Sequence, residues 1–429
     1  MKKLVAFMAL GVLALGVAGC DSKDKGNTVE LVYSGTQSDK DFTLKLIDNF
    51  KTMKKKSGDD TNYVIDYVAH GPDMVDSEII DWTAANSPDV YEYAPDKLAI
   101  LYDKGALAEI RSTYKDFIDT KINDFGKSNA TLNGKYYGYP YTGDNTYYFQ
   151  YDKRVFTSED VKSMERILEV AAEKNAKVAY PLETAFWGAG VMFTFGADYS
   201  IEFDRDGKVA GVTADFDTDK GLKGAKALVK IMQSPAYVND AESVPSETNG
   251  IVGGIAGTWK IADYKKALGE NYGCAPMPTI TIGEETKNIG AFVGGKLLGV
   301  NPLRAQNDVK RLTAAHELAM YLAGEECQNK RYDELSWGPC NVDSLKRSDI
   351  QADANMVVLN EQLKFAHAQT STPTNLWDAA TKLVAGIKDG TYSVEGKTEG
   401  NSSIAGLTFT DETLKVAIDT YNTAVKSSE

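Results

Sequence analysis

Short strands alternate with helices over the first hundred residues, and this order constrains the fold more than any other feature of the chain. Apolar residues alternate with polar ones at 29–33, and they recur at helical spacing after Asp39. Two further strands are expected before Pro95. Strands that alternate with helices form parallel sheets, so the sequence predicts an α/β protein. Ligands of such sheets bind beyond the carboxyl ends of strands, here at 35–37 and 93–97.

Residues 134–156 hold seven tyrosines and alternate bulky aromatic with small or polar residues. This pattern predicts extended chain, with two interpretations. One is an aromatic hairpin that turns at 142–145, and the other is a strand that leaves one domain and enters another along the floor of a cleft. A chain of 429 residues is long enough for two domains, so both interpretations remain open.

The N-terminus predicts export and lipidation. Two lysines precede an apolar run at 4–18, which is too short for an ordinary membrane span. The run ends Val-Ala-Gly-Cys20, which resembles the lipobox of bacterial lipoproteins. This resemblance implies a signal peptide at 1–19, a diacylglycerol on the Cys20 thiol and a lipidated tether at 20–28. The alternative is a secretory signal with an incidental cysteine. We expect a protein on the outer face of the cytoplasmic membrane.

Charge and cysteine spacing exclude several classes of function. The net charge of −14 disfavours nucleic-acid binding, which needs basic patches. Cys274, Cys327 and Cys340 fit neither a disulfide framework nor a zinc site. A bridge between Cys327 and Cys340 and a pair of buried free thiols are both compatible with the spacing.

Two near-motifs for catalysis fail on a required residue. Residues 290–297 fit a phosphate-binding loop until Leu297, where a hydroxyl must bind magnesium, so glycines that let two backbones approach are the better explanation. The helix after His316 carries Met320 where a zinc protease has its second histidine. No Ser-His-Asp arrangement is suggested either, and we expect no metal and no cofactor. Paired carboxylates for glycoside hydrolysis stay open in a sequence this acidic.

Several stretches together, in order along the chain, resemble the extracellular solute-binding proteins of ABC importers, in the maltose/maltodextrin-binding group. They are SPDVYEYAPDK at 87–97 with KGALAEI at 104–110, NGKYYGYP at 133–140 with YDK at 151–153, GTW at 257–259, FVGG at 292–295, and AMYL at 319–322 through Gln328. The resemblance implies two discontinuous α/β domains joined by a hinge around a ligand cleft. The first domain takes 29–141 plus 296–332 and the second takes 142–295 plus 337–429.

The resemblance also places a ligand site between the domains. It implies neutral contacts from the loop after the first strand, an aromatic contact, an acid–base pair in which lysine replaces the more usual arginine, an acid just past the first crossing, and aromatic platforms on the second domain. A further tryptophan lies at a predicted crossing. In chain order these are Thr36, Gln37, Tyr93, Asp96, Lys97, Asp144, Phe186 or Trp187, Trp259, Trp337 and Trp377.

Flat rings and carboxylates suit a sugar, which has an apolar C–H face and a rim of hydroxyls. The sequence therefore predicts a carbohydrate-binding protein without catalysis. The resemblance further implies a monomer and a maltose/maltodextrin-like ligand that is passed to an ABC permease. Two alternatives stay open. The acidic cleft could hold a polyamine or peptide, or the chain could be a surface lipoprotein glycosidase.

Overall fold

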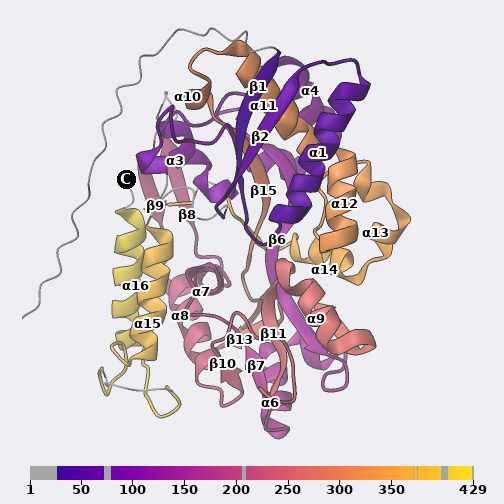
Figure 1. Ribbon diagram of the computed structural model, residues 1–429. Helices are drawn as coiled ribbons and strands as arrows, with labels where there is room; N and C mark the ends of the chain where they lie inside the picture. Colours follow the sequence, from indigo (N-terminus) through magenta and orange to yellow (C-terminus); the bar gives the residue numbers. More distant parts are fainter. Residues whose placement is uncertain are drawn as a thin grey trace, which may run out of the picture.

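One ten-stranded sheet runs through the computed structural model, which describes residues 27–71, 79–204, 209–370, 372–373, 375–397 and 404–427. Its strand order is β10-β7-β11-β6-β15-β3-β1-β2, with β12 paired to β6 and β16 to β15. In Figure 1, β1 and β2 lie in the upper part, β7, β10 and β11 lie in the lower part, and β6 and β15 run between them. We call these parts the first and second lobes.

The first lobe contains the parallel strands that the sequence predicts. β1 (Thr28–Gly35) pairs in parallel with β2 (Asn62–Ala69) and β3 (Val90–Tyr93). Residues 72–78, where the sequence predicts part of a helix, lie outside the described residues. The other elements of this lobe are α1 (Lys40–Lys56), η1 (Ile79–Asp81), η2 (Pro95–Lys97), α3 (Leu98–Asp103), α4 (Ser112–Lys121), α5 (Asp124–Asn129), β4 (Thr131–Leu132), β5 (Lys135–Tyr136), α10 (Pro302–Ala305), α11 (Val309–Leu322) and α12 (Glu325–Leu335).

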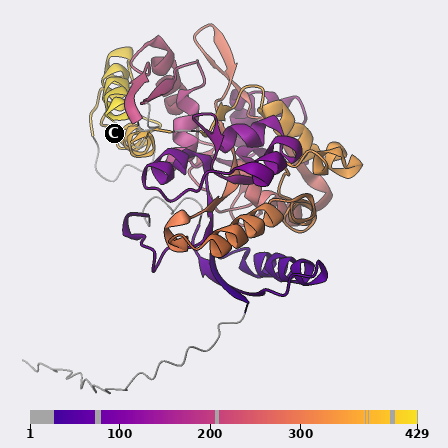
Figure 2. The same ribbon diagram turned by 90° about the horizontal axis from the view of Figure 1, so that it is seen from above.

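The second lobe takes most of the chain between the two crossing strands together with the C-terminal helices. Figure 2, seen from above, shows α15 and α16 packed together at one side of the molecule. The elements include α6 (Met164–Glu173), β7 (Lys177–Ala179), α7 (Ala185–Met192), β8 (Tyr199–Phe203), β9 (Val209–Ala214), α8 (Asp219–Met232), β10 (Tyr237–Val238), β11 (Ile251–Gly257), η4 (Thr258–Lys260), α9 (Ile261–Leu268), β12 (Tyr272–Ala275), β13 (Thr279–Ile282), β14 (Glu285–Asn288), β16 (His367–Ala368), α15 (Leu376–Lys388) and α16 (Asp411–Lys426). The helices α13 (Ser348–Ala352) and α14 (Ala354–Gln362) lie at the side of the molecule next to α12 and pack against residues of both lobes (Figure 1).

Residues 139–152 of the tyrosine-rich stretch form one continuous strand, β6 (Tyr139–Asp152), which runs straight through 142–145, so the hairpin interpretation is wrong. Its first half pairs with β15 (Phe292–Val300), where Tyr139 faces Leu298. Its second half pairs with β11, where Tyr147 faces Gly257. Both pairings are antiparallel, so the sheet is mixed rather than parallel throughout. β6 is therefore the strand that passes from one lobe to the other, as the second interpretation predicts.

Glycine lets the two crossing strands approach each other closely. A Cβ atom on Gly295 would lie 2.3 Å from the carbonyl oxygen of Thr142 on β6, a distance that no side chain tolerates. The β6–β15 register shifts on both sides of Lys296, so the approach coincides with an irregularity in the ladder. The glycines of the false phosphate-binding motif thus serve strand packing, as the sequence analysis expects.

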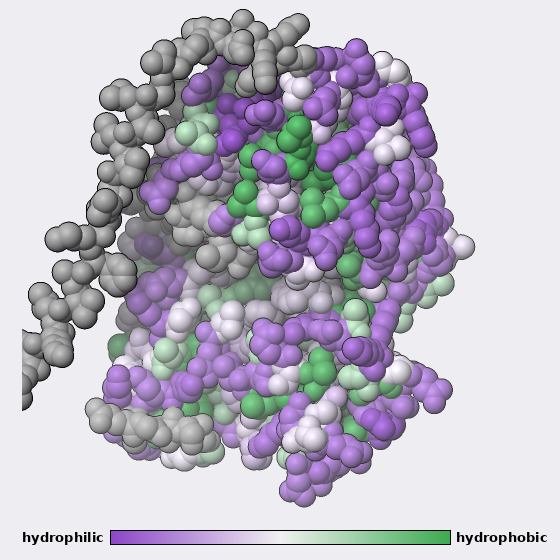
Figure 3. All heavy atoms as spheres, viewed as in Figure 1, coloured by the Kyte–Doolittle hydropathy of each residue, from purple (hydrophilic) through white to green (hydrophobic). Residues whose placement is uncertain are grey.

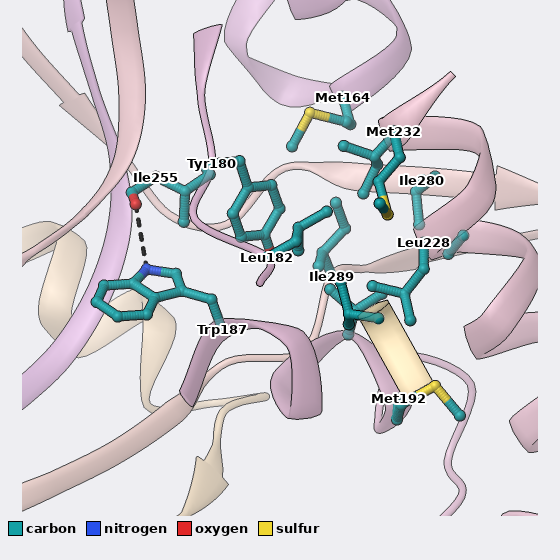
Figure 4. Close-up of a cluster of buried hydrophobic side chains, with 14 of the residues drawn as sticks. Met164, Tyr180, Leu182, Trp187, Met192, Leu228, Met232, Ile255, Ile280 and Ile289 are labelled. Atoms are coloured by element: carbon teal, nitrogen blue, oxygen red, sulfur yellow. Dashed lines mark hydrogen bonds between the residues drawn. The ribbon is translucent and has the colours of Figure 1, made fainter. Parts of the chain in front are cut away.

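Each lobe has its own hydrophobic core, and each core draws on distant parts of the chain. The first combines side chains of β1 and α1 with Tyr139, Leu298 and α11. The second combines residues between Tyr147 and Phe292 with α15 and α16. Figure 4 shows part of this second core, in which Trp187, Tyr180 and Leu182 lie beside Ile289 and side chains of α8. Each core is therefore completed by helices from a later part of the chain, α11 in the first lobe and α15 and α16 in the second.

The cysteines of the described chain are free thiols. Cys327 and Cys340 are both buried in the first core, and Cys274 is partly buried. Burial raises the pKa of the Cys327 thiol to about 11 and that of Cys340 to about 12. Of the two possibilities left open by the spacing, the structure has buried free thiols. Cys20, the predicted lipidation site, lies outside the described residues.

Within the described ranges, the structure contains no helix long and apolar enough to span a membrane.

Candidate functional site

An aromatic group lies at the top of the second lobe and brings together three of the predicted site residues. Phe186 of α7 has its ring centroid 6.5 Å from that of Trp259 on η4 and 6.2 Å from that of Trp377 on α15. Phe292 of β15 completes the group, stacked on Phe186 at 5.6 Å. The Trp259 ring is the most accessible, because the residue is 40% exposed. These rings come from four separate elements that meet only in the folded lobe.

Trp187, the alternative to Phe186, belongs to the core. It is 7% exposed, and its indole N–H donates to the carbonyl oxygen of Ile255 on β11 at 3.2 Å, as Figure 4 shows. Its ring packs against that of Trp259 in an edge-to-face contact with centroids 6.0 Å apart. Between these two neighbours, the structure therefore favours Phe186 as the residue on the accessible side, with Trp187 holding the aromatic group in place.

Asp96 connects the first lobe to this aromatic group. It lies on η2, is 9% exposed, and forms an ion pair with the Lys97 ammonium at 3.2 Å. Its carboxylate also accepts a hydrogen bond from the indole N–H of Trp377 at 3.2 Å and one from the side-chain amide of Gln369 at 3.0 Å. Two residues predicted on opposite sides of the ligand thus touch each other directly. A ligand between them would require the lobes to move apart.

Tyr93, the predicted aromatic contact, is a buried side chain of the first lobe. It is 0% exposed and packs with Tyr91 and Leu297 in a small cluster of the first lobe. Among the described residues, its hydroxyl has no hydrogen-bond partner. Gly138 leaves room for that hydroxyl, because a Cβ atom there would lie 2.3 Å from it. A ligand could reach Tyr93 only if the side chains around it moved, so its contact with ligand stays a prediction.

The loop after β1 is held by a buried acid that is not among the predicted site residues. Glu92 of β3 is buried, and its carboxylate accepts hydrogen bonds from the Tyr33 hydroxyl at 2.7 Å and the Thr36 hydroxyl at 3.1 Å. The Tyr67 hydroxyl donates to the carbonyl oxygen of Thr36 at 2.6 Å. Gln37, the next residue, is exposed. Thr36 is therefore fixed by the lobe itself, and Gln37 is the free side chain of this pair.

Asp144 lies at the crossing between the lobes. It is buried on β6, and its carboxylate accepts the backbone N–H of Gly338, while its carbonyl oxygen accepts the Thr258 hydroxyl at 2.6 Å. Burial raises the pKa of this carboxyl to about 6, against the lowering effect of the Gly338 hydrogen bond and of nearby Lys296. Asp144 thus ties β6 to two other segments that cross between or border the lobes.

Trp337 sits at the same crossing, away from the aromatic group described above. The Lys296 ammonium lies 3.5 Å from the centroid of its ring, a cation–π contact, and the Tyr141 ring is 6.5 Å away. Its other packing is against the first core. The structure therefore brings Phe186, Trp259, Trp377, Asp96 and Lys97 together and places Trp337 and Asp144 at the hinge.

Sequence reasoning missed Gln369, Glu92 and Asn145, all of which are polar and lie close to predicted site residues. Gln369 follows β16 in a short polar run before Trp377, and only the break in the helical pattern after Phe365 marks that run. Neither Glu92 nor Asn145 has a sequence signal apart from its neighbours Tyr93 and Asp144. Among the described side chains no group of three or more could hold a metal ion.

The surface in Figure 3 is hollowed between the upper and lower parts of the molecule. Two α/β lobes, strands that cross between them and a site of aromatic rings facing an acid are the features of a two-domain solute-binding protein. Residues 45–358 match the family described as bacterial extracellular solute-binding protein, and the chain belongs to that family.

Named relatives and solved structures agree with this class. The chain is 25% identical to the maltodextrin-binding protein MdxE of Bacillus subtilis (strain 168), over 94% of this chain and 96% of the relative. It is 22% identical to a galactooligosaccharide-binding protein of the same organism, over 90% and 92%. A structure solved with acarbose is 25% identical, with a TM-score of 0.76 over 93% of this chain and 99% of that one. The maltodextrin-binding protein MalE1 from L. casei BL23, without ligand, is 18% identical, with a TM-score of 0.70 over 92% and 99%.

Proposed function

We propose that this protein binds a maltodextrin-like oligosaccharide between its lobes and delivers it to the permease of an ABC importer, without catalysing a reaction on it. The observation that carries the proposal is the meeting of Asp96 and Trp377, an acid of the first lobe and a ring of the second, beside the accessible Trp259. The names of the relatives, one for maltodextrin and one for galactooligosaccharide, support a carbohydrate ligand.

The chemistry of the site suits a sugar. The apolar face of a pyranose ring would lie against Trp259 or Phe186, whose rings already form a group with centroids 6.5 Å apart. Hydroxyls at the rim of the same sugar would donate to the Asp96 carboxylate and accept from the Lys97 ammonium. A carboxylate only accepts hydrogen bonds and an ammonium only donates them, so the pair can bind hydroxyl groups both as donors and as acceptors.

The remaining features of the proposal concern the setting of the site. The lobes correspond to domains at 29–141 plus 296–332 and at 142–295 plus 337–429, and they close as a monomer by bending at β6, β15 and the segment around Gly338. The first core contains Leu298, and the second contains Phe292, which supports a boundary within β15. A diacylglycerol on Cys20 would hold the protein at the outer face of the cytoplasmic membrane.

Calorimetric titration of the purified mature chain tests this function. We expect saturable binding of maltotriose and longer maltodextrins, no binding of putrescine or of a short peptide, and no release of reducing sugar from the oligosaccharides. Melting temperature should rise with maltodextrin concentration, because a ligand that binds only the folded state stabilises it. Binding of putrescine or peptide in place of sugar would overturn the carbohydrate assignment, and reducing-sugar release would overturn the absence of catalysis.

A further inference from the structure

Gln369 joins three parts of the molecule that meet between the lobes. Gln369 is buried, with 5% of its surface exposed. Its side-chain N–H donates to the Asp96 carboxylate at 3.0 Å, its side-chain carbonyl oxygen accepts from the Asn145 amide at 2.8 Å, and its backbone N–H donates to the Val293 carbonyl oxygen at 2.8 Å. One buried amide thus connects the first lobe, strand β6 and strand β15.

The chemistry of its partners fixes the orientation of this amide. A carboxylate can only accept, so the NH₂ of Gln369 must face Asp96, and its carbonyl oxygen is left for the Asn145 amide donor. The space is shaped to hold it, because a Cβ atom on Gly294 would lie 2.8 Å from the Gln369 carbonyl oxygen. A glycine on β15 therefore leaves the room that the amide occupies.

We propose that Gln369 is a positioning residue for the ligand, which orients the Asp96 carboxylate and ties it through Asn145 to crossing strand β6. This inference rests on the proposed function, because it assigns Asp96 to the sugar. Gln369 binds Oδ1 of that carboxylate, whereas Trp377 and the Lys97 ammonium both contact Oδ2. When a sugar replaces Trp377, the Gln369 hydrogen bond on Oδ1 and the Lys97 ion pair on Oδ2 still hold the plane of the carboxylate. A carboxylate has about four acceptor positions, and a fixed plane directs those that remain toward the sugar hydroxyls.

The same bridge relates the acid to the hinge. Asn145 pairs with Gly294 where β6 and β15 cross between the lobes. When a sugar replaces the contact between Asp96 and Trp377, Gln369 keeps the Asp96 carboxylate in a fixed position relative to crossing strand β6. The hydrogen bonds from Asp96 through Gln369 to Asn145 thereby couple ligand binding at Asp96 to the strands about which the lobes bend.

The test is calorimetric titration with maltotriose of the wild type, Gln369→Met and Gln369→Glu, each over pH 5 to 8. Methionine keeps the volume but removes both side-chain hydrogen bonds, so we expect affinity to fall about tenfold to a hundredfold. Gln233→Met is the matched control, because the Gln233 amide donates to the Leu407 carbonyl oxygen at 3.0 Å far from the site, and it should bind as the wild type does.

Gln369→Glu gives a signature that a merely structural role would not produce. At pH 8 the introduced carboxylate faces the Asp96 carboxylate, and binding should be at least as weak as in Gln369→Met. At pH 5 the new carboxyl shares a proton with Asp96 and can donate to it as the amide does. The ratio of the variant's affinity to that of the wild type, both measured at the same pH, should therefore be at least fivefold higher at pH 5 than at pH 8. Circular dichroism confirms that each variant is folded where binding is measured.

The outcomes separate the two proposals. Binding by Gln369→Met within twofold of the wild type, or the same affinity ratio for Gln369→Glu at pH 5 and pH 8, overturns the positioning role. A wild type that binds no oligosaccharide overturns the proposed function instead. If Gln369→Met does not fold, the pH profile of Gln369→Glu decides by itself.

Discussion

Replacing Trp259 with alanine tests the aromatic side of the proposed site most directly, because this ring is accessible. The indole packs on Phe186 and Trp187 along one side, and the residue is 40% exposed. An indole side chain has about 250 Å² of surface, so about 100 Å² is left for a ligand to cover. At about 25 cal/mol per Å², cover of between half and all of that surface contributes about 1.3–2.5 kcal/mol. The dissociation constant should therefore rise about tenfold to seventyfold.

Folding stability should respond much less than binding. Loss of a fully buried tryptophan costs about 3–5 kcal/mol of unfolding free energy, and Trp259 should lose clearly less because part of its ring already faces solvent. The assays are calorimetric affinity for maltotriose and the urea midpoint of each variant. Trp82→Ala is the control, since Trp82 packs edge-to-face on Tyr91 at 4.9 Å in the first lobe, and it should lose stability but keep affinity.

The result that refutes this reasoning is specific. If Trp259→Ala binds maltotriose with the affinity of the wild type, the ring does not face the ligand. If it loses unfolding free energy as much as a core tryptophan does, the ring is a core side chain. Trp377 gives a less clear test, because its indole N–H also donates to Asp96 and its loss would disturb both ring and acid.

Three further changes test separate parts of the account. Asp96→Asn keeps the shape but removes the charge, so maltotriose affinity should fall by about 1.5–3 kcal/mol, and an unchanged calorimetric affinity would exclude a sugar contact. His316 is buried 2.7 Å from the Tyr139 hydroxyl, and burial lowers its pKa to about 4 from the ordinary 6.5. As pH falls, the unfolded chain takes up a proton on His316 before the folded chain does, so the unfolding free energy should fall by up to about 3 kcal/mol between about pH 6.5 and about pH 4. The urea midpoint of His316→Gln should fall less over this range than that of the wild type. An equal fall would contradict the assignment of this pH dependence to His316. Cys20→Ala should abolish labelling of the cell-bound protein by radioactive palmitate, and persistent labelling would contradict the lipobox.

The sequence by itself determined the local structure of this protein, because periodicity and turn chemistry are local properties. The strands β1–β3 and the helix after Asp39 follow from spacings that are visible in the chain. The role of the glycines in β15 was also predictable. The phosphate-binding motif fails at Leu297, and close approach of two backbones is the remaining reason for glycines at these positions. The family followed from a set of weak segments in a fixed order.

The tertiary structure decided which of the predicted residues meet and which are buried. Phe186 and Trp187 are neighbours in sequence, yet a helix turns their side chains in different directions, and only packing against β11 shows that Trp187 belongs to the core. The contact between Asp96, Gln369 and Trp377 joins residues more than 270 positions apart, and no periodicity extends over such a distance. Whether the tyrosine stretch turned or continued depended on its partners β15 and β11, which lie more than a hundred residues further along the chain. Pairing over that distance is a property of the folded sheet, because strands of the same local pattern can find either kind of partner.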